Sequence, residues 1–496
     1  MANKMASLAK DTAIYGLSSI IGRFLNYMLV PLYTAKIKAE TGGYGEVTEI
    51  YAWTALFLVL LTFGMETTLF RFANKERVDT EKAFSTSLIS VGTVSAIFAL
   101  LCWIFIKPIS SGLGYQDHPE YIKMMSLVVA FDAFQAILFS YLRLKKKAIK
   151  FATLKLLFIV VNISLNLFVF LVVPKIYHLF PTLLGWFNSG ELVRYIFTIN
   201  LICTTLLTLG FIPELKGIES GVDPALLKRM LKYSWPLLLL GLTGILNQVA
   251  DKICFKHLIP GPKGVYLLGV YGGAIKVAMI MTMLTQAFRY AYEPIVFSDK
   301  RESGGDKKMY ADAMKYFVIF ALLAFLTVVF YIDVLRFIID KSYWDGLAVV
   351  PIVMIAEIFM GVYFNLSFWY KLSDETWWGA IISGIGCIVL FAVNILFVPK
   401  YGYMASAWGG FAGYGVCMIL SYFIGQKKSP VDYPLGKIGK YILLAAALWG
   451  VSELLNPLNF WLKIVLRTLL LGINIIYIIK NDLSLKNIPY INRFVK

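Results

Sequence analysis

Apolar runs of about 20 residues, separated by short loops, follow one another along almost the whole chain. A helix of this length crosses the hydrocarbon core of a bilayer and satisfies its own backbone polar groups there. The runs therefore predict an all-α membrane protein with about 14 transmembrane helices. The predicted spans cover residues 12–35, 47–70, 84–106, 121–143, 151–173, 187–211, 231–255, 266–290, 312–338, 347–370, 377–398, 402–424, 439–455 and 459–479.

The charged residues support this interpretation and indicate an orientation. Only 16% of the residues are charged, against about 25% in a typical soluble domain. A net charge of +17 can indicate a nucleic-acid partner, but here the Lys and Arg residues are spread over short loops. About 29 of them fall on one side of the predicted membrane and about 10 on the other. This positive-inside bias predicts that both termini are cytoplasmic and that nucleic acid is not a partner.

An internal repeat divides the predicted helices into two halves. Tyr15 and Arg71 in the first half match Tyr233 and Arg289 in the second half at one common spacing. Two related six-helix bundles followed by two further helices are therefore expected, with a substrate site near the membrane midplane between the halves. The predicted divisions are residues 1–215, 216–425 and 426–496.

Several spans carry polar and ionisable side chains. A charge in hydrocarbon costs at least about 2.5–3.5 kcal/mol, so these side chains are expected to face a wet cavity lined by protein. Thr243, Asn247 and Asp251 recur every four residues and share one helix face. Lys276 and Gln286 lie on one face of the following span. We interpret the cavity that these spans would line as the functional site.

Short motifs in a fixed order carry a family resemblance. They occur at residues 64–72, 247–252, 269–277, 287–294 and 394–407, and include Asn247-x-x-x-Asp251-Lys252. Together they resemble the polysaccharide-exporting flippases of the multidrug/oligosaccharidyl-lipid/polysaccharide (MOP) exporter superfamily. The resemblance covers essentially the whole chain. It implies movement of an undecaprenyl-pyrophosphate-linked oligosaccharide from the inner to the outer leaflet of a bacterial inner (plasma) membrane.

A lipid-linked diphosphate is anionic, so its carrier needs cations and hydrogen-bond donors in the cavity. Arg23 lies in the middle of a span, too deep to reach the membrane surface easily. Arg71, Lys252 and Arg289 lie near span ends, where long side chains can also extend to the interface. The residues expected to bind substrate are Arg23, Asn26, Arg71, Asn247, Lys252, Lys276, Gln286 and Arg289.

Carboxylates inside the spans have two interpretations, which the sequence leaves open. They pair with the cations as structural bridges, or one of them binds a coupling ion, H⁺ or Na⁺. The candidates for ion coupling are Glu66, Asp132, Asp251 and Glu357.

Missing motifs narrow the function further. The sequence has no Gly-x-x-x-x-Gly-Lys-Ser/Thr loop for ATP, no metal-ligand cluster and no large loop with acid and base residues. We therefore expect a transporter without a cofactor, and not an enzyme. Its partners would be the lipid-linked oligosaccharide, the bilayer, a coupling ion and the polysaccharide polymerase machinery.

Three other functions stay open. These are a lipid II flippase, a multidrug/cation antiporter of the same superfamily, and a membrane-embedded glycan polymerase or ligase. The antiporter would need a cavity dominated by acidic residues, whereas the spans here carry many basic ones.

Overall fold

The computed structural model describes residues 21–482, apart from residues 22, 23, 26, 75, 77, 183, 217, 219, 220, 304–306 and 374. This part of the chain forms helices and no strand. Thirteen of the described helical segments are long and apolar enough to cross a membrane. They correspond one to one with the second to the fourteenth predicted spans, which confirms a multi-pass, all-α membrane protein. The first predicted span lies mostly outside the described residues.

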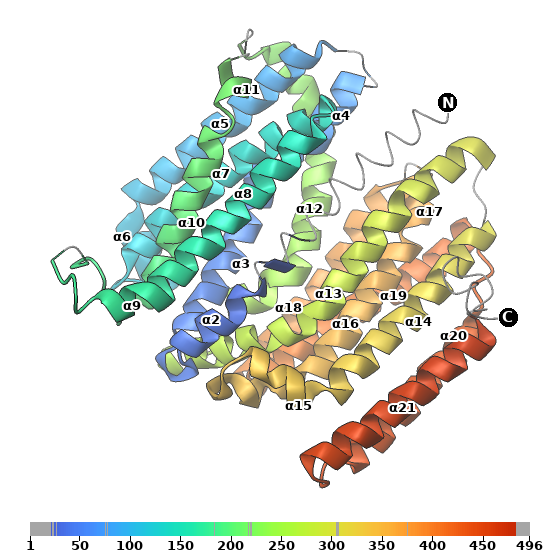
Figure 1. Ribbon diagram of the computed structural model, residues 1–496. Helices are drawn as coiled ribbons and strands as arrows, with labels where there is room; N and C mark the ends of the chain where they lie inside the picture. Colours follow the sequence, from blue (N-terminus) through green and yellow to red (C-terminus); the bar gives the residue numbers. More distant parts are fainter. Residues whose placement is uncertain are drawn as a thin grey trace.

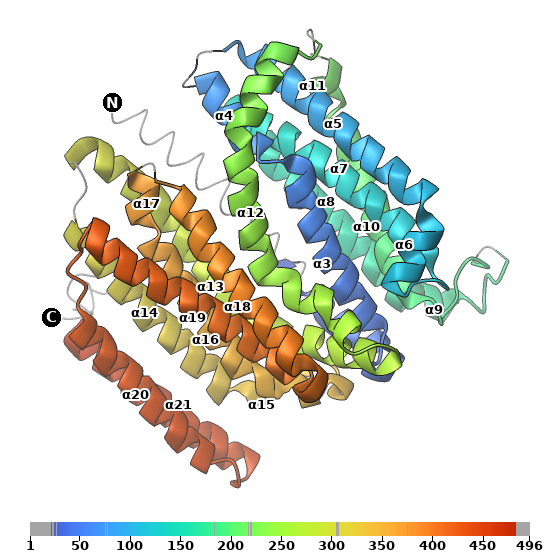
Figure 2. The same ribbon diagram turned by 180° about the vertical axis from the view of Figure 1, so that it is seen from behind.

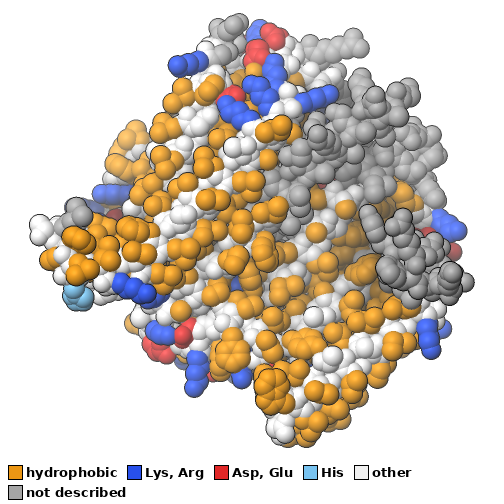
Figure 3. Space-filling view, in the orientation of Figure 1, with side chains coloured by type: hydrophobic (Ala, Val, Ile, Leu, Met, Phe, Trp, Pro, Cys, Tyr) orange, Lys and Arg blue, Asp and Glu red, His pale blue; other side chains and the backbone are white. Residues whose placement is uncertain are grey.

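The surface is that of a protein surrounded by lipid. In Figure 3, hydrophobic side chains cover much of the visible face, while Lys and Arg residues gather toward its margins. Large apolar side chains such as Leu454 and Trp461 are 77% and 75% exposed. A contiguous apolar surface of this kind is stable in hydrocarbon and would associate in water.

The first bundle, coloured blue to green in Figure 1, is centred on α7, which packs against α3, α5 and α10. Its elements are α2 Leu29–Lys36, η1 Ala39–Thr41, α3 Gly43–Thr62, α4 Met65–Asn74, α5 Thr80–Ile104, α6 Ile106–Leu113, α7 Pro119–Leu144, α8 Ala148–Leu167, the π-helical η2 Phe168–Val172, α9 Val173–Ile176, α10 Leu192–Leu209 and α11 Ile212–Lys216. The chain turns between α3 and α4 at Gly64, whose φ of 69° favours glycine.

The second bundle is built around α19, which packs against both α16 and α18. Its elements are α12 Pro224–Leu258, α13 Pro262–Ser303, α14 Lys307–Phe330, α15 Ile332–Leu335, η3 Arg336–Ile338, η4 Lys341–Val349, α16 Val350–Leu366, α17 Phe368–Leu372, α18 Trp377–Tyr401 and α19 Tyr403–Lys428. The predicted arrangement of two helical bundles is therefore present.

Helix α12 connects the two bundles, as Figures 1 and 2 show. It contacts α4 and α5 of the first bundle, and it also packs against α3 and α18. Pro236 lies inside this helix and cannot donate a backbone hydrogen bond. Because this hydrogen bond is missing, the 35-residue helix can bend at Pro236 when one bundle moves against the other.

The last two helices, α20 Leu435–Leu454 and α21 Phe460–Asn481, form a hairpin that packs against α14 (red in Figure 1). Ion pairs attach the hairpin at both of its ends. Arg467 donates to Asp333, with 3.0 Å between Nη1 and Oδ2. At the other end, Lys315 Nζ lies 2.8 Å from Asp482 Oδ1. The side chains of Arg467 and Asp482 are buried, so these ion pairs hold the hairpin in a defined position.

The two bundles contact each other closely at one end of the molecule, which we call the closed end. A Cβ atom on Gly45 of α3 would lie 2.1 Å from the carbonyl oxygen of Val265 in α13, so only glycine fits there. Lys38 also forms an ion pair with Asp340 across this contact. Burial acts against it, but the Lys38 ammonium and the Ser342 amide hold the pKa of Asp340 below its ordinary value.

The opposite end, which we call the basic end, carries most of the Lys and Arg residues of the loops. Helices α4 and α17 both lie toward this end, one in each bundle, and Figures 1 and 2 show them well apart. Arg143 and Lys145 near the end of α7 and Lys427 and Lys428 at the end of α19 belong to this group. Apart from α12, which contacts α4 and α5 of the first bundle, the two bundles therefore contact each other at the closed end and lie apart toward the basic end.

Candidate functional site

A cavity of about 250 Å³ lies inside the second bundle, between α12, α13, α16, α18 and α19. It brings together five of the residues predicted from the sequence. These are Asn247, Asp251, Lys252, Lys276 and Glu357. Gln248, which is exposed, also lines the cavity and marks where it reaches the surface of the bundle. We call this space the central cavity; it lies within the second bundle, whereas the repeat predicted a site between the halves.

Asp251 and Lys252, neighbours near the end of α12, form an ion pair on the cavity wall. The Lys252 ammonium lies 2.9 Å and 3.1 Å from the two carboxylate oxygens of Asp251. The Tyr271 hydroxyl donates to the same carboxylate at 2.8 Å. Asp251 is only 6% exposed, so these bonds replace the water that the carboxylate loses on burial. The ion pair agrees with the structural-bridge interpretation of Asp251, and the ion-coupling interpretation stays a prediction.

Lys276 and Glu357 line the same cavity without comparable partners. Lys276, on α13, makes no hydrogen bond or ion pair with the described residues. Glu357, on α16, interacts with the Thr282 hydroxyl, but its buried Oε2 atom has no hydrogen-bond partner in the part of the chain that the structure describes. Unpaired polar atoms inside a protein are normally satisfied by water or by a ligand. The cavity carries two basic and two acidic side chains. Asp251 already neutralises Lys252, which leaves Lys276 available to an anion and Glu357 to a cation.

Asn247 connects α12 to α18 at the cavity wall. Its amide nitrogen donates to the carbonyl oxygens of Thr243 and Ser383, at 2.9 Å and 2.8 Å. Its buried Oδ1 atom has no hydrogen-bond partner in the described structure. The amide therefore holds two helices together and leaves one acceptor unsatisfied.

Two predicted residues of the first bundle lie near the basic end, outside the central cavity. Glu66 accepts from Arg143 at 3.3 Å and from the Ser140 hydroxyl at 3.2 Å. Arg71 stacks over the Tyr233 ring, with 4.2 Å between its guanidinium carbon and the ring centroid. Glu66 is thus engaged in a bridge within the first bundle, and Arg71 is partly exposed near the basic end.

Arg289 and Gln286 lie on α13, beyond the central cavity toward the basic end. Arg289 is exposed and lies 3.6 Å from Glu293 in an ion pair one turn apart. Gln286 is half-buried and does not line the cavity. The ten residues between Lys276 and Gln286 correspond to about 15 Å along a helix. One basic side chain on each bundle, Arg71 and Arg289, therefore stands near the basic end.

Asp132 belongs to a separate polar region inside the first bundle. It makes no hydrogen bond or ion pair with the described residues, and Lys155 is the cation that acts on it. Nearby, Asn200 donates to the Tyr51 hydroxyl at 2.8 Å. Asn166 accepts from Tyr33 at the same distance. The remaining two predicted residues, Arg23 and Asn26, lie outside the described residues.

Sequence reasoning missed a cluster that joins the bundles next to the central cavity. Glu49 of α3, 1% exposed, accepts from the Tyr115 hydroxyl at 2.6 Å. Lys256 of α12 lies 3.6 Å from the same carboxylate and 3.7 Å from the centroid of the Tyr115 ring. The sequence signal that could have found this cluster is the position of Lys256, one helical turn after Lys252. This cluster lies on the closed-end side of the cavity.

Comparison with known proteins identifies the family. The family model for polysaccharide biosynthesis proteins matches residues 8–298, more than half of the chain. No curated protein sequence matches this chain. Among solved structures, the lipid II flippase MurJ in an inward closed conformation is 16% identical, with a TM-score of 0.70, and the match covers 94% of this chain and 99% of that one.

Transporters of the MATE family have the same architecture. A multidrug resistance MATE family transporter of the MOP superfamily in its inward-facing conformation is 14% identical, with a TM-score of 0.61, and the match covers 84% of this chain and 94% of that one. An outward-facing conformation of such a transporter is also 14% identical, with a TM-score of 0.56 and coverage of 84% and 95%. At these identities the likeness shows the fold. The chain therefore belongs to the polysaccharide biosynthesis protein family and has the fold of the MOP-superfamily transporters.

Proposed function

We propose that this protein is a flippase that carries a polyprenyl-pyrophosphate-linked oligosaccharide across the bacterial inner membrane by alternating access. The observation that carries the proposal is Lys276, a cation in a membrane-embedded cavity with no described protein partner. The family match and the two-bundle fold support a transporter, and the unpaired ammonium supports an anionic cargo.

In this mechanism the diphosphate enters from the basic end, which faces the cytoplasm together with both termini. Lys276 binds the diphosphate, and Lys252 contributes when the anion competes with Asp251. Arg71 and Arg289, near the basic end, attract the head group, and Arg23 and Asn26, which lie outside the described residues, stay candidates for binding it. The polyprenyl tail stays in the bilayer. When the bundles move, two contacts at the closed end separate. These are the Glu49–Lys256 ion pair and the packing of Gly45 against Val265.

A gradient of H⁺ or Na⁺, or the membrane potential, would return the carrier to its starting state. Glu357 is our first candidate for the coupling ion, because its buried oxygen lacks a hydrogen-bond partner in the described structure and faces the same cavity as Lys276. Asp132 is the second candidate, in the first bundle. Glu66 and Asp251 form ion pairs with Arg143 and Lys252. Each would bind the coupling ion only by giving up this partner.

A lipid II flippase is the second candidate, favoured by the similarity to MurJ over almost the whole chain. It would use the same cavity, because its cargo carries the same diphosphate. The in vivo experiment replaces Lys276 with Gln and compares it with Lys263→Gln, an exposed lysine on the same helix. Loss of surface polysaccharide with normal growth is expected for Lys276→Gln alone.

Other outcomes of this experiment assign other functions. Lethality of Lys276→Gln would indicate lipid II as the cargo, and drug hypersensitivity would indicate an antiporter. Normal polysaccharide in the Lys276→Gln strain would contradict the proposed role of this residue. Lys276→Arg, which keeps the charge, should retain most of the transport.

A further inference from the structure

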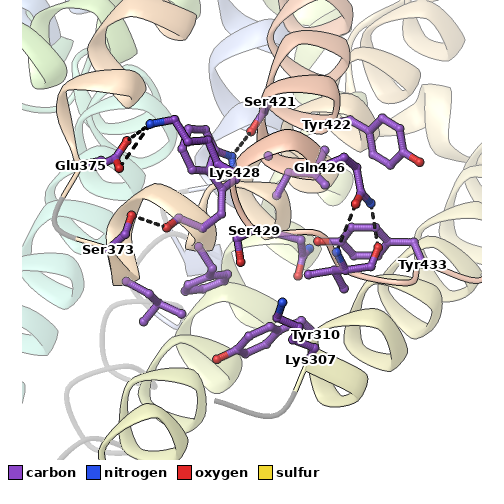
Figure 4. Close-up of a pocket in the computed structure, with 17 residues that line it drawn as sticks. Lys307, Tyr310, Ser373, Glu375, Ser421, Tyr422, Gln426, Lys428, Ser429 and Tyr433 are labelled. Atoms are coloured by element: carbon purple, nitrogen blue, oxygen red, sulfur yellow. Dashed lines mark hydrogen bonds and ion pairs between the residues drawn. The ribbon is translucent and has the colours of Figure 1, made fainter. Parts of the chain in front are cut away.

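A second cavity, of about 310 Å³, lies at the basic end of the second bundle. Figure 4 shows it between the start of α14, α17 with the loop after it, the end of α19, and the segment that leads to α20. It shares no lining residue with the central cavity. We call it the basic-end pocket, and it is separate from the cavity that Lys276 and Glu357 line.

The polar groups of the basic-end pocket suit an anion that also carries a hydroxyl group. Lys428 pairs with Glu375 at 3.1 Å, whereas Lys307 makes no hydrogen bond or ion pair with the described residues. Asn365, 6% exposed, donates its amide to the Gly361 carbonyl at 3.0 Å. Its buried Oδ1 atom has no hydrogen-bond partner in the described structure. The pocket thus offers one uncompensated cation and one unsatisfied acceptor.

The pocket continues into an apolar groove of about 530 Å³ between α14, α16, α19 and α20. Leu366, Tyr422 and Tyr433 line both spaces. At the rim of the groove Phe423 is 61% exposed and Ile442 is 48% exposed, so the groove opens sideways to the hydrocarbon.

The groove is long enough to hold an acyl chain that crosses one leaflet of a bilayer. From Leu435 to Trp449, which both line it, α20 rises by about 21 Å. One leaflet contributes about 15 Å of hydrocarbon. A polar pocket that continues into an apolar groove of at least this length can hold the head group and an acyl chain of a glycerophospholipid.

We propose that the basic-end pocket and the groove bind one anionic glycerophospholipid whose head group carries a hydroxyl, such as phosphatidylglycerol. Its phosphate binds Lys307 and Lys428, a head-group hydroxyl donates to Asn365, and an acyl chain fills the groove. The lipid acts as a resident ligand that bridges α20 and the second bundle. This proposal does not depend on the identity of the transported molecule.

Native mass spectrometry of the full-length protein in detergent tests the head-group contact. Phosphatidylglycerol and phosphatidylethanolamine with identical acyl chains are titrated separately. The wild-type protein should retain one phosphatidylglycerol in preference to phosphatidylethanolamine. Lys307→Gln should weaken this binding about tenfold, which corresponds to one charge-assisted hydrogen bond. The control Lys437→Gln, an exposed lysine of α20 outside the pocket, should bind as the wild type does.

A second pair of variants tests the acyl-chain groove. Ala446 and Ala447 are both exposed on α20, but only Ala446 lines the groove. Ala446→Trp should lower lipid retention, and Ala447→Trp should not. Equal retention by all these proteins, or equal affinity for the two lipids, would overturn the proposal. Lys276→Gln should retain the lipid normally, so a failure here is distinct from a failure of the proposed transport function.

Discussion

At the scale of single residues, the Asp251–Lys252 pair shows how a charge is accommodated within a membrane protein. Both side chains are mostly buried, at 8% and 17% exposure, and the Tyr271 hydroxyl completes the hydrogen bonding of the carboxylate. Removing one member of such a pair is more costly than removing both, because a lone buried charge has no compensation.

Asp251→Asn should therefore lower the free energy of unfolding by about 2–3 kcal/mol, because it leaves the Lys252 ammonium without its carboxylate. The measurement is unfolding of the purified protein in detergent. The double variant Asp251→Asn/Lys252→Gln should recover part of the loss. If the double variant is less stable than the wild type by the full sum of the two single changes, Asp251→Asn and Lys252→Gln, the two residues are not coupled as described.

At the scale of elements, the contact between α3 and α13 depends on glycine. A Cβ on Gly45 would approach the Val265 carbonyl oxygen to 2.1 Å, and a backbone atom cannot move aside as a flexible side chain can. Gly45→Ala should therefore destabilise the closed end, by about 1–3 kcal/mol as in other overpacked sites. Unfolding in detergent measures this cost. Gly436→Ala, where an added Cβ meets nothing within 4 Å, is the control and should be neutral or stabilising.

The Lys38–Asp340 pair, between the segment after α2 and the start of η4, predicts a dependence on pH. The pKa of Asp340 is below its ordinary value in the folded protein, so the pair stabilises the fold fully above about pH 4. That contribution is lost as the pH falls through the lowered pKa. The stability difference between the wild type and Asp340→Asn should be constant from pH 7 to about pH 5 and should shrink below about pH 4. A difference that grows on acidification would contradict this assignment.

At the scale of the whole molecule, hydropathy predicted the number of described spans because lipid requires long, apolar, internally bonded helices. The i, i+4 spacing on α12 also identified Asn247 and Asp251 as cavity residues. The pairing of Glu49 with Lys256 was not predictable, because it depends on how α3 packs against α12. The same limit explains Arg71 and Arg289, whose position near the basic end agrees with both interpretations of a cation at a span end.

The central cavity lies elsewhere than the site that the repeat predicts, which stays a prediction. A repeat of two bundles favours a site between them, but Lys276 and Glu357 line a cavity inside the second bundle. Side chains of α12, α13 and α16 face α18 and α19 of their own bundle, and this follows from tertiary packing that no single span encodes. The division at residues 215 and 425 stays a prediction, because α12 contacts both bundles.

The most direct test of the central claim is leaflet transfer of a polyprenyl-diphosphate oligosaccharide in vesicles that contain the purified protein. The wild type and Lys263→Gln should transfer the lipid at similar rates. Lys276→Gln should be slower by at least about tenfold, because the diphosphate loses its charge-assisted contact. Transfer by Lys276→Gln at the wild-type rate would contradict the account, because the cavity would then not hold the diphosphate.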